Sequence, residues 1–217
     1  MVVKFDRAMI PASPDLSFEH SLFSSGIELV AGLDEAGRGA WAGPVTAAAV
    51  VLDLHLPTDP LLGLARDSKQ LRPQQRIQLE PFIKRSALGW GVGFASNEEI
   101  DQFGILPATR LAMTRALEAL RVFPQHLLID ALLLSETNVP QAALIKGDQR
   151  SLSIAAASIL AKTARDRFMQ EQAIHENRFS FEYNKGYGTR AHQAALVAHG
   201  PCSLHRFSYA PVKLAIK

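Results

Sequence analysis

The sequence contains a single cysteine, Cys202, among 217 residues. An internal disulfide is therefore excluded, and so is a zinc site built from thiolates, because such a site needs at least two cysteines. No apolar run reaches the roughly 18 residues that span a bilayer, and charged residues at positions 4, 6 and 7 interrupt the N-terminus before a signal peptide could form. We therefore expect a cytoplasmic globular protein that does not enter a membrane.

The composition is that of an ordinary globular chain. Hydrophobic residues make up 47% and charged residues 20%, which argues against disorder. The length fits one domain, and the sequence lacks repeats and low-complexity tracts. We expect residues 1–26, with Pro11, Pro14 and several serines, to form a loosely structured lead-in. Residues 27–217 are expected to form a single domain that acts as a monomer.

Charge is unevenly distributed along the chain. Residues 140–217 hold 11 Lys and Arg against 5 Asp and Glu, a balance of +6, whereas residues 1–139 carry a balance of −4. A basic C-terminal third favours a polyanionic partner, and an acidic remainder favours a separate cluster of carboxylates. Uneven helix composition without any partner would give the same totals, so charge alone leaves both interpretations open.

The hydrophobic pattern predicts an α/β fold. Short apolar runs predict strands, and longer stretches with helical spacing predict helices. Their order along the chain indicates a mixed β-sheet flanked by helices, followed by a C-terminal helical extension. The expected strands are 27–33, 45–52, 90–95, 127–134 and 142–145, and the expected helices are 107–122, 151–173 and 189–198.

Two adjacent carboxylates, Asp34 and Glu35, follow the first apolar run. Ionised carboxylates are rarely buried without a partner. Because successive strand residues point to opposite faces, both can reach one site only if the strand ends or bulges there, which Gly37 and Gly39 would permit. Arg38 between them could reach a phosphate or a hydroxyl. A solvated loop after a strand is the alternative interpretation.

Two further aspartates occupy unusual positions. Asp130 interrupts the apolar run 127–134, where an unpaired carboxylate is costly, so it needs a metal, a cation or a hydrogen-bond donor. Asp148 precedes the longest predicted helix, where an aspartate is often only a cap. Four carboxylates that converge would repel one another and have raised pKa values. Mg²⁺ or Mn²⁺ would remove this repulsion, and a pair of such ions is a common device for displacement at phosphorus.

Several blocks resemble ribonuclease HII, in the order of that family and over roughly residues 28–212. The first, DEAGRG at residues 34–39, is followed by AGPV at 42–45. The remaining blocks are 67–71 (DSKQL), 129–131 (IDA), 146–148 (KGD), 153–162 (SIAAASILAK), 165–167 (RDR), 185–189 (KGYGT) and 205–208 (HRFS). The chain is identified by these blocks as a member of the type 2 ribonuclease H family.

The resemblance implies a ribonuclease H-like fold and hydrolysis of RNA paired to DNA. It also implies incision 5′ to a single ribonucleotide within duplex DNA. The resemblance further implies that the protein holds two Mn²⁺ or Mg²⁺ ions and that its catalytic carboxylates are Asp34, Glu35, Asp130 and Asp148. The turn that reads ribose 2′-hydroxyls falls on Gly37, Arg38 and Gly39, and the tyrosine at the RNA–DNA junction falls on Tyr187. Ribonuclease HIII carries a Lys in place of this Arg and a long N-terminal domain, so HII is the better match.

Basic residues complete the expected substrate surface. Lys162, Arg165 and Lys185 are candidates for contacts to substrate phosphates, together with Arg167 and Arg190. Asp166 is either a further carboxylate near the metals or the partner of a neighbouring arginine. We expect no metal at His192, His199 or His205, and an inert Cys202.

Two other functions remain as alternatives. A nuclease of the same fold acting on DNA alone would have no use for a turn that reads 2′-hydroxyls. A non-catalytic nucleic-acid binding module would need the basic surface but not four carboxylates, which repel phosphate unless they are loaded with metal.

Overall fold

The computed structural model describes residues 6, 10–56, 59–65 and 67–216. Its centre is a five-stranded mixed sheet with the strand order β3-β2-β1-β4-β5. β1 is antiparallel to β2, β2 is antiparallel to β3, and β1, β4 and β5 run parallel. The strands are β1 (Val30–Ala36), β2 (Val45–Leu52), β3 (Ala87–Ala95), β4 (His126–Asp130) and β5 (Gln141–Leu144).

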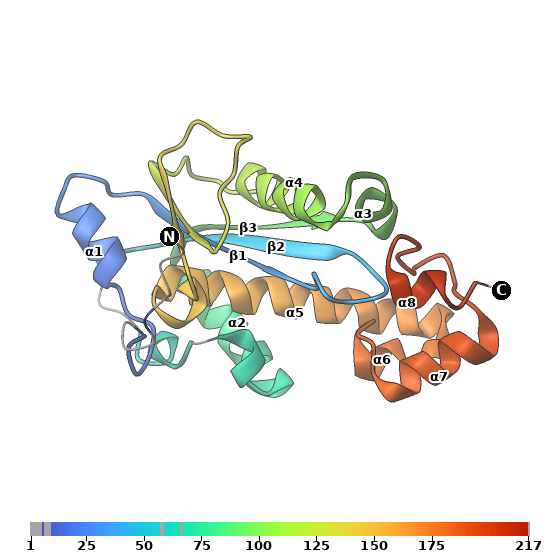
Figure 1. Ribbon diagram of the computed structural model, residues 1–217. Coiled ribbons are helices and arrows are strands. Elements are labelled where there is room, and N and C mark those ends of the chain that lie inside the picture. Colours follow the sequence, from blue (N-terminus) through green and yellow to red (C-terminus); the bar gives the residue numbers. More distant parts are fainter. Residues whose placement is uncertain (1–5, 7–9, 57–58, 66, 217) are drawn as a thin grey trace.

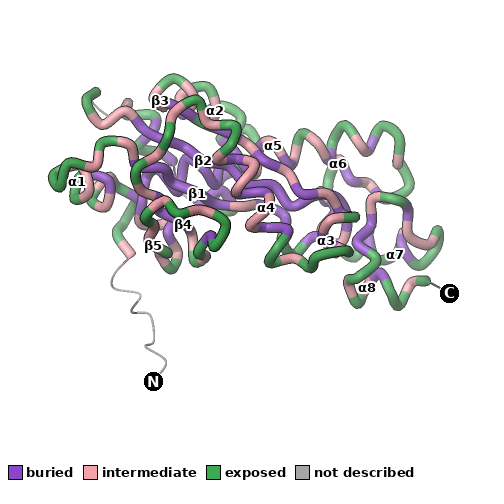
Figure 2. Tube along the Cα trace, turned by 90° about the horizontal axis from the view of Figure 1, so that it is seen from above, coloured by how far each residue is buried: buried purple, intermediate pink, exposed green. Residues whose placement is uncertain are grey.

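Helices cover both faces of the sheet (Figure 1). α5 (Leu152–His175) and α2 (Pro73–Ser86) lie on one face, and α4 (Ile105–Glu118) lies on the other with α3 (Asn97–Phe103) beside it. Every residue of β2 is buried, because both of its faces are covered. Figure 2 shows the buried backbone running through the middle of the molecule. The expected α/β fold is confirmed.

α5 packs closely against β1. Its first half is rich in Ala and Ser, and residues 152–161 are all buried. Gly32 on β1 permits this approach, since a Cβ there would lie 2.2 Å from the Ser153 carbonyl carbon. The Ser151 side chain caps the helix by accepting a hydrogen bond from the Ile154 N–H.

The C-terminal helical extension is also confirmed. It packs on a second small core around Phe179, Phe181 and Leu196, at the far end of α5 (Figure 1). The extension comprises η5 (Asn177–Phe179), α6 (Phe181–Asn184), α7 (Arg190–His199) and α8 (Ala210–Lys213).

Several expected boundaries need correction. The run 127–134 was expected to be one strand, but β4 ends at Asp130 because Ala131 adopts a left-handed conformation with φ of 48°. The helix expected at 107–122 begins at Ile105 and ends at Glu118. The pattern missed α2, which buries only Arg76, Leu79 and Ile83 and carries Pro81 in its interior. It also missed α3, although Ser96 and Glu99 form a capping box at its start.

The lead-in is more ordered than its composition indicates. It contains α1 (Ser17–Phe23), whose Glu19 side chain is buried against the start of α5. Glu19 Oε1 accepts three hydrogen bonds, from the Ser151 hydroxyl, the Ser153 hydroxyl and the Ser153 backbone N–H, at 2.6 to 3.0 Å. The expectation of a loose segment is therefore wrong for α1.

No helix in the described part of the chain is long and apolar enough to cross a membrane.

Candidate active site

Asp34 and Asp130 lie beside each other on two parallel strands, Asp34 two residues before the end of β1 and Asp130 at the end of β4. Leu33 pairs with Ile129 in the register of β1 and β4, and the next residue on each strand is an aspartate. Leu33 and Ile129 belong to the core on the α4 face. Because side chains alternate along a strand, both aspartates face α5.

Asp148 reaches the same place from a different segment. It lies in η4 (Gly147–Gln149), a single 3₁₀ turn directly before α5, and its side chain is buried. The backbone N–H of Gly147 donates a 2.7 Å hydrogen bond to Asp130 Oδ1, which ties this turn to the end of β4. Three of the four predicted carboxylates therefore gather on the α5 side of the sheet.

The four carboxyl groups disfavour one another's charges. Burial raises the pKa of Asp34 well above its ordinary value, and the charges of Glu35, Asp130 and Asp148 raise it further. Burial, followed by the charge of Asp130, raises the pKa of Asp148 to about 7. Burial also raises the pKa of Asp130 and of Glu35. Shifts in this direction are typical of clustered carboxylates that await a cation.

Glu35 occupies a special position in this cluster. Strand alternation directs it away from the face on which Asp34 lies, and β1 continues through Ala36 without the break that the sequence suggested. Its Oε1 accepts a hydrogen bond from Arg38 at 3.1 Å, which opposes the effect of burial on its pKa. Its Oε2 is buried and has no hydrogen-bond partner. A buried carboxylate oxygen without a partner is costly unless a ligand supplies one.

The donor set fits a hard divalent cation. All four candidate ligands are carboxylates, which Mg²⁺ and Mn²⁺ prefer, and a bound cation would offset both the mutual repulsion and the unpartnered Glu35 oxygen. Within the described residues, no three Asp, Glu, His or Cys side chains already stand in a ligating arrangement. The side chains would therefore adjust when an ion binds.

Sequence reasoning missed three residues of this site. Burial and the charge of Asp130 raise the pKa of Asp148 most, and the charge of Asp67 raises it further. Lys69 is exposed as a residue. Partial burial of its side chain opposes the charged form, but Asp67, Asp34, Asp148 and Glu35 outweigh this effect and raise its pKa. Ser158 on α5 is buried, donates a hydrogen bond to Ser68 Oγ at 2.9 Å, and acts against the rise in the pKa of Asp34 that burial causes. The block 67–71 was a usable signal for the first two.

The turn after β1 is shaped by a buried arginine. Gly37 has φ of 94°, and a Cβ at Gly37 would lie 2.0 Å from Arg165 Nε, so only glycine fits. Gly39 faces open space, and Arg38 is exposed. The carbonyl of Arg38 accepts hydrogen bonds from Arg206 Nη1 at 2.9 Å and from the Tyr209 hydroxyl at 2.6 Å. Arg206 and Tyr209 thus hold the backbone of the turn, while Arg38 and Gly39 stay exposed to solvent.

Arg165 does not contact substrate phosphate in this fold. Its side chain is fully buried, and its guanidinium donates to the carbonyls of Pro44, Lys185 and Ala42 at 2.8 to 3.0 Å. Burial lowers its pKa to about 10. The prediction of a phosphate contact is wrong for this residue, because helical spacing does not reveal which side of α5 the C-terminal extension covers. Arg165 instead joins two loops.

One of those loops carries Tyr187, which is half-buried. The Tyr187 ring lies 5.2 Å from the Arg165 guanidinium and 5.0 Å from Lys162 Nζ. Gly37 and Tyr187 therefore both pack against the Arg165 side chain. Gly186 reinforces the link, because its carbonyl accepts the backbone N–H of Trp41 at 2.8 Å.

Three of the remaining predicted cations, Lys162, Lys185 and Arg167, are engaged by the protein, and Arg167 pairs with Glu80 at 2.9 Å. Lys162 Nζ lies 2.6 Å from Asp166 Oδ1, and Arg76 lies 3.0 Å from the other Asp166 oxygen. Asp166 is therefore an ion-pair partner, one of the two possibilities that the sequence left open. Lys185 Nζ donates to the carbonyl of Glu182. Phosphate contacts by Lys162 and Lys185 stay predictions.

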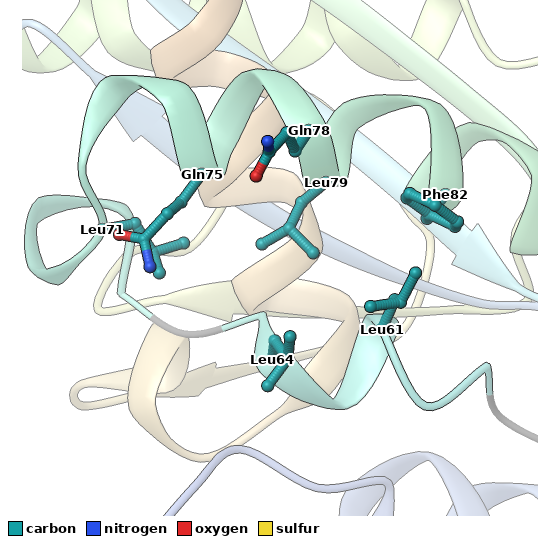
Figure 3. A pocket seen from close by; sticks show the side chains of 7 residues that line it. All are labelled: Leu61, Leu64, Leu71, Gln75, Gln78, Leu79 and Phe82. Atoms are coloured by element: carbon teal, nitrogen blue, oxygen red, sulfur yellow. The ribbon is translucent and has the colours of Figure 1, made fainter.

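An apolar pocket lies elsewhere on the molecule and lacks this chemistry. It has a volume of about 430 Å³ between η2 (Leu62–Leu64) and α2, and none of the described residues that line it is charged (Figure 3). The lining residues are Leu61, Leu64, Leu71, Gln75, Gln78, Leu79 and Phe82. The candidate active site is the carboxylate cluster and not this pocket.

Known proteins share both the sequence and the fold. The profile of the ribonuclease HII family matches residues 31–212. Ribonuclease HII from Chloroflexus aurantiacus is 51% identical over 200 residues, which cover 92% of this chain and 94% of that protein. The structure of ribonuclease H2 from Pyrococcus horikoshii is similar, with a TM-score of 0.70 and 27% identity over 86% of this chain and 96% of that one. Ribonuclease HII from Archaeoglobus fulgidus, solved in complex with PCNA, gives a TM-score of 0.71 and 26% identity over 87% and 97% of the two chains.

Proposed function

The chain belongs to the ribonuclease HII family of metal-dependent endonucleases, and we propose that it hydrolyses the RNA strand of RNA/DNA hybrids and incises 5′ to a single ribonucleotide embedded in duplex DNA. The observation that carries the proposal is the carboxylate cluster next to the turn of Gly37. The charges of Asp34, Glu35, Asp130 and Asp148 act on one another there, and no hydroxyl or thiol nucleophile is needed for a reaction in which water attacks phosphorus.

We propose that Asp34, Glu35, Asp130 and Asp148 are the metal ligands. Two Mn²⁺ or Mg²⁺ ions held by these oxygens would activate a water and stabilise the leaving 3′-oxygen. The P–O3′ bond breaks as the water oxygen bonds to phosphorus, which leaves a 5′-phosphate and a 3′-hydroxyl. Lys69, among the same carboxylates, supplies positive charge where a phosphate must approach.

We propose that Gly37, Arg38, Gly39 and Tyr187 distinguish ribose from deoxyribose. Glycine exposes the backbone groups of the turn to a sugar, and the 2′-hydroxyl both donates and accepts hydrogen bonds. Tyr187 offers a half-buried ring from the neighbouring loop, with the Arg165 side chain between the two elements. Lys162 and Lys185, close to this loop, would contact the flanking phosphates.

The test is incubation with a labelled DNA duplex that contains one ribonucleotide, with Mn²⁺, with Mg²⁺ and with chelator. We expect one cut on the 5′ side of the ribonucleotide, only in the presence of metal, with product ends of the stated polarity. An all-DNA duplex of the same sequence is the control, and cutting of that duplex would favour the DNA nuclease instead. Binding without cleavage under all three conditions would contradict the proposed function.

A further inference from the structure

Two histidines in the core of the C-terminal extension face each other and take no part in the proposed chemistry. His192 on α7 and His205 in the following loop are both fully buried. Their Nε2 atoms lie 3.0 Å apart, which is a hydrogen-bond distance. Only one of the two nitrogens can carry a proton in such a contact.

The carbonyl of Tyr187 fixes which nitrogen carries it. This oxygen can only accept, and it lies 2.9 Å from His192 Nδ1, so His192 carries its proton on Nδ1 and, as a neutral ring, accepts at Nε2. His205 must then carry its proton on Nε2 and accept at Nδ1, where the backbone N–H of Cys202 points at 3.0 Å. The carbonyl oxygen and Sγ of Cys202 also lie near His205 Nδ1, at 3.3 and 3.2 Å, but in this tautomer Nδ1 has no proton to donate to them. Both rings are neutral, in agreement with the lowered pKa of each, for which burial is the main cause.

The proton on His192 Nδ1 is directed at the Tyr187 loop. His192 Nδ1 lies 2.9 Å from the carbonyl oxygen of Tyr187. The hydrogen bonds therefore run in one direction, from the Cys202 N–H through His205 and His192 to the Tyr187 carbonyl. The N–H of Thr189 donates to the same carbonyl at 2.8 Å, and the N–H of Tyr187 donates to Asn184 at 2.9 Å.

Aromatic neighbours fix the His192 ring itself. It packs against Trp41 at 5.6 Å and edge-on against Phe181 at 5.4 Å between ring centroids. Trp41 belongs to the segment that follows the turn of Gly37, and its backbone N–H bonds Gly186, the residue before Tyr187. The His192 ring is thus set between the two elements that were assigned to ribose reading.

From this geometry we propose that His192 is a positioning residue for Tyr187, and that His205 holds it in the tautomer that donates to the Tyr187 carbonyl. The bond orients the backbone at Tyr187 and so sets where its ring meets the sugar. This inference rests on the proposed role of Tyr187 in recognising a single ribonucleotide. It adds a buried hydrogen-bond relay that does not touch the substrate.

Two substitutions at His192 separate the two bonds of the ring. In His192→Asn the side-chain amide takes the place of Nδ1, so the donor to Tyr187 is kept and the bond to His205 is lost. In His192→Gln the amide takes the place of Nε2, so the bond to His205 is kept and the donor to Tyr187 is lost. Both variants remove the ring, so they are matched for loss of packing.

The readout is kcat/KM on a duplex with one ribonucleotide divided by kcat/KM on a long RNA/DNA hybrid, measured on one preparation. The folded fraction cancels in this ratio, so partial unfolding does not move it. We expect His192→Gln to lower the ratio about five- to tenfold, the ordinary effect of one hydrogen bond, and His192→Asn to leave it within about twofold of the unsubstituted protein. In a Tyr187→Ala background, His192→Gln should not lower the ratio further.

Different failures have different meanings. Equal ratios for the Asn and Gln variants would overturn the positioning role of His192, because packing alone would then explain both. If Tyr187→Ala lowers the ratio and His192→Gln does not, the relay is wrong and the role of Tyr187 stands. If Tyr187→Ala leaves the ratio unchanged, the proposed reading role of Tyr187 fails, and the inference about His192 fails with it.

Discussion

Asp130 accepts a 2.7 Å hydrogen bond from the backbone N–H of Gly147, and this bond sets the distance between two catalytic candidates before any ion binds. It joins the end of β4 to the turn that carries Asp148. An Asn at position 130 retains an oxygen that can accept the same bond. The substitution Asp130→Asn therefore removes the charge at this site and can keep the hydrogen bond to Gly147.

The first prediction concerns charge. Asp34→Asn, Asp130→Asn and Asp148→Asn should each lower cleavage by several orders of magnitude while substrate binding is largely retained, because each removes a negative charge from the proposed metal site. Steady-state cleavage and a binding assay on the same duplex measure the two effects. Glu118→Gln, at an exposed position at the end of α4, is the control. Full activity in any of the three aspartate variants would remove that residue from the catalytic set.

The second prediction concerns stability without metal. A ligand that binds only the folded state stabilises it by about 2.7 kcal/mol at a hundredfold excess over its Kd. For a domain of this size that is a rise in Tm of roughly 5–10 °C. Mg²⁺ or Mn²⁺ should therefore raise Tm, and Asp34→Asn should raise it in chelator, since repulsion within the cluster is relieved. A lower Tm for Asp34→Asn than for the unsubstituted protein in chelator would contradict the clustering.

The third prediction concerns pH. The pKa of Asp148 is raised from 3.8 to about 7 in the folded protein. The folded state thus binds the extra proton more tightly than the unfolded state, and the Asp148 charge costs stability progressively as pH rises from about 4 to 7. In chelator, Asp148→Asn should melt above the unsubstituted protein at pH 8, and the difference should disappear near pH 4. A difference independent of pH would show that packing, and not charge, separates the two.

The fourth prediction concerns Tyr187. Tyr187→Ala should lower kcat/KM at a single ribonucleotide about tenfold or more beyond its effect on a long hybrid, because a site built around a hydroxyl depends on each contact to it. A long hybrid offers several 2′-hydroxyls and more binding registers. Tyr183→Ala, at a position 83% exposed nearby in the chain, is the matched control and should leave the ratio unchanged. An equal fall on both substrates would mean that Tyr187 serves folding or catalysis generally.

The fifth prediction concerns the lead-in. Glu19→Ala should lower Tm by several degrees, because it leaves Ser151 and Ser153 without their acceptor at the start of α5, a loss of about 1–3 kcal/mol. Thermal melts of this variant and of Glu28→Ala, which changes an exposed side chain, make the comparison. Identical melting temperatures would mean that α1 adds nothing to the stability of the fold.

The local sequence was sufficient to predict features that lie within a single strand or turn. β2 matches the apolar run 45–52, and Asp34 within β1 and Asp130 at the end of β4 were visible as carboxylates next to apolar runs. The blocks around residues 34–39 and 146–148 identified the family, because backbone turns and charged ligands need particular residue types at fixed spacing. α2 was missed because its buried face is small and its sequence is largely polar.

Only the tertiary structure decided which charged side chains are buried and what they contact. Arg165 has helical spacing with Lys162, yet its three carbonyl partners are residues 42 and 44, more than a hundred residues before it, and residue 185, in the extension that follows α5. The His192–His205 contact and the Glu19 bonds to α5 likewise join separate segments of the chain. The spacing of residues along a helix shows which of them share one side of it. Which segment covers that side depends on how distant parts of the chain pack. The sequence by itself therefore determined the family and predicted the four candidate carboxylates, and the packing determined the contacts that hold the Gly37 turn and the Tyr187 loop in place.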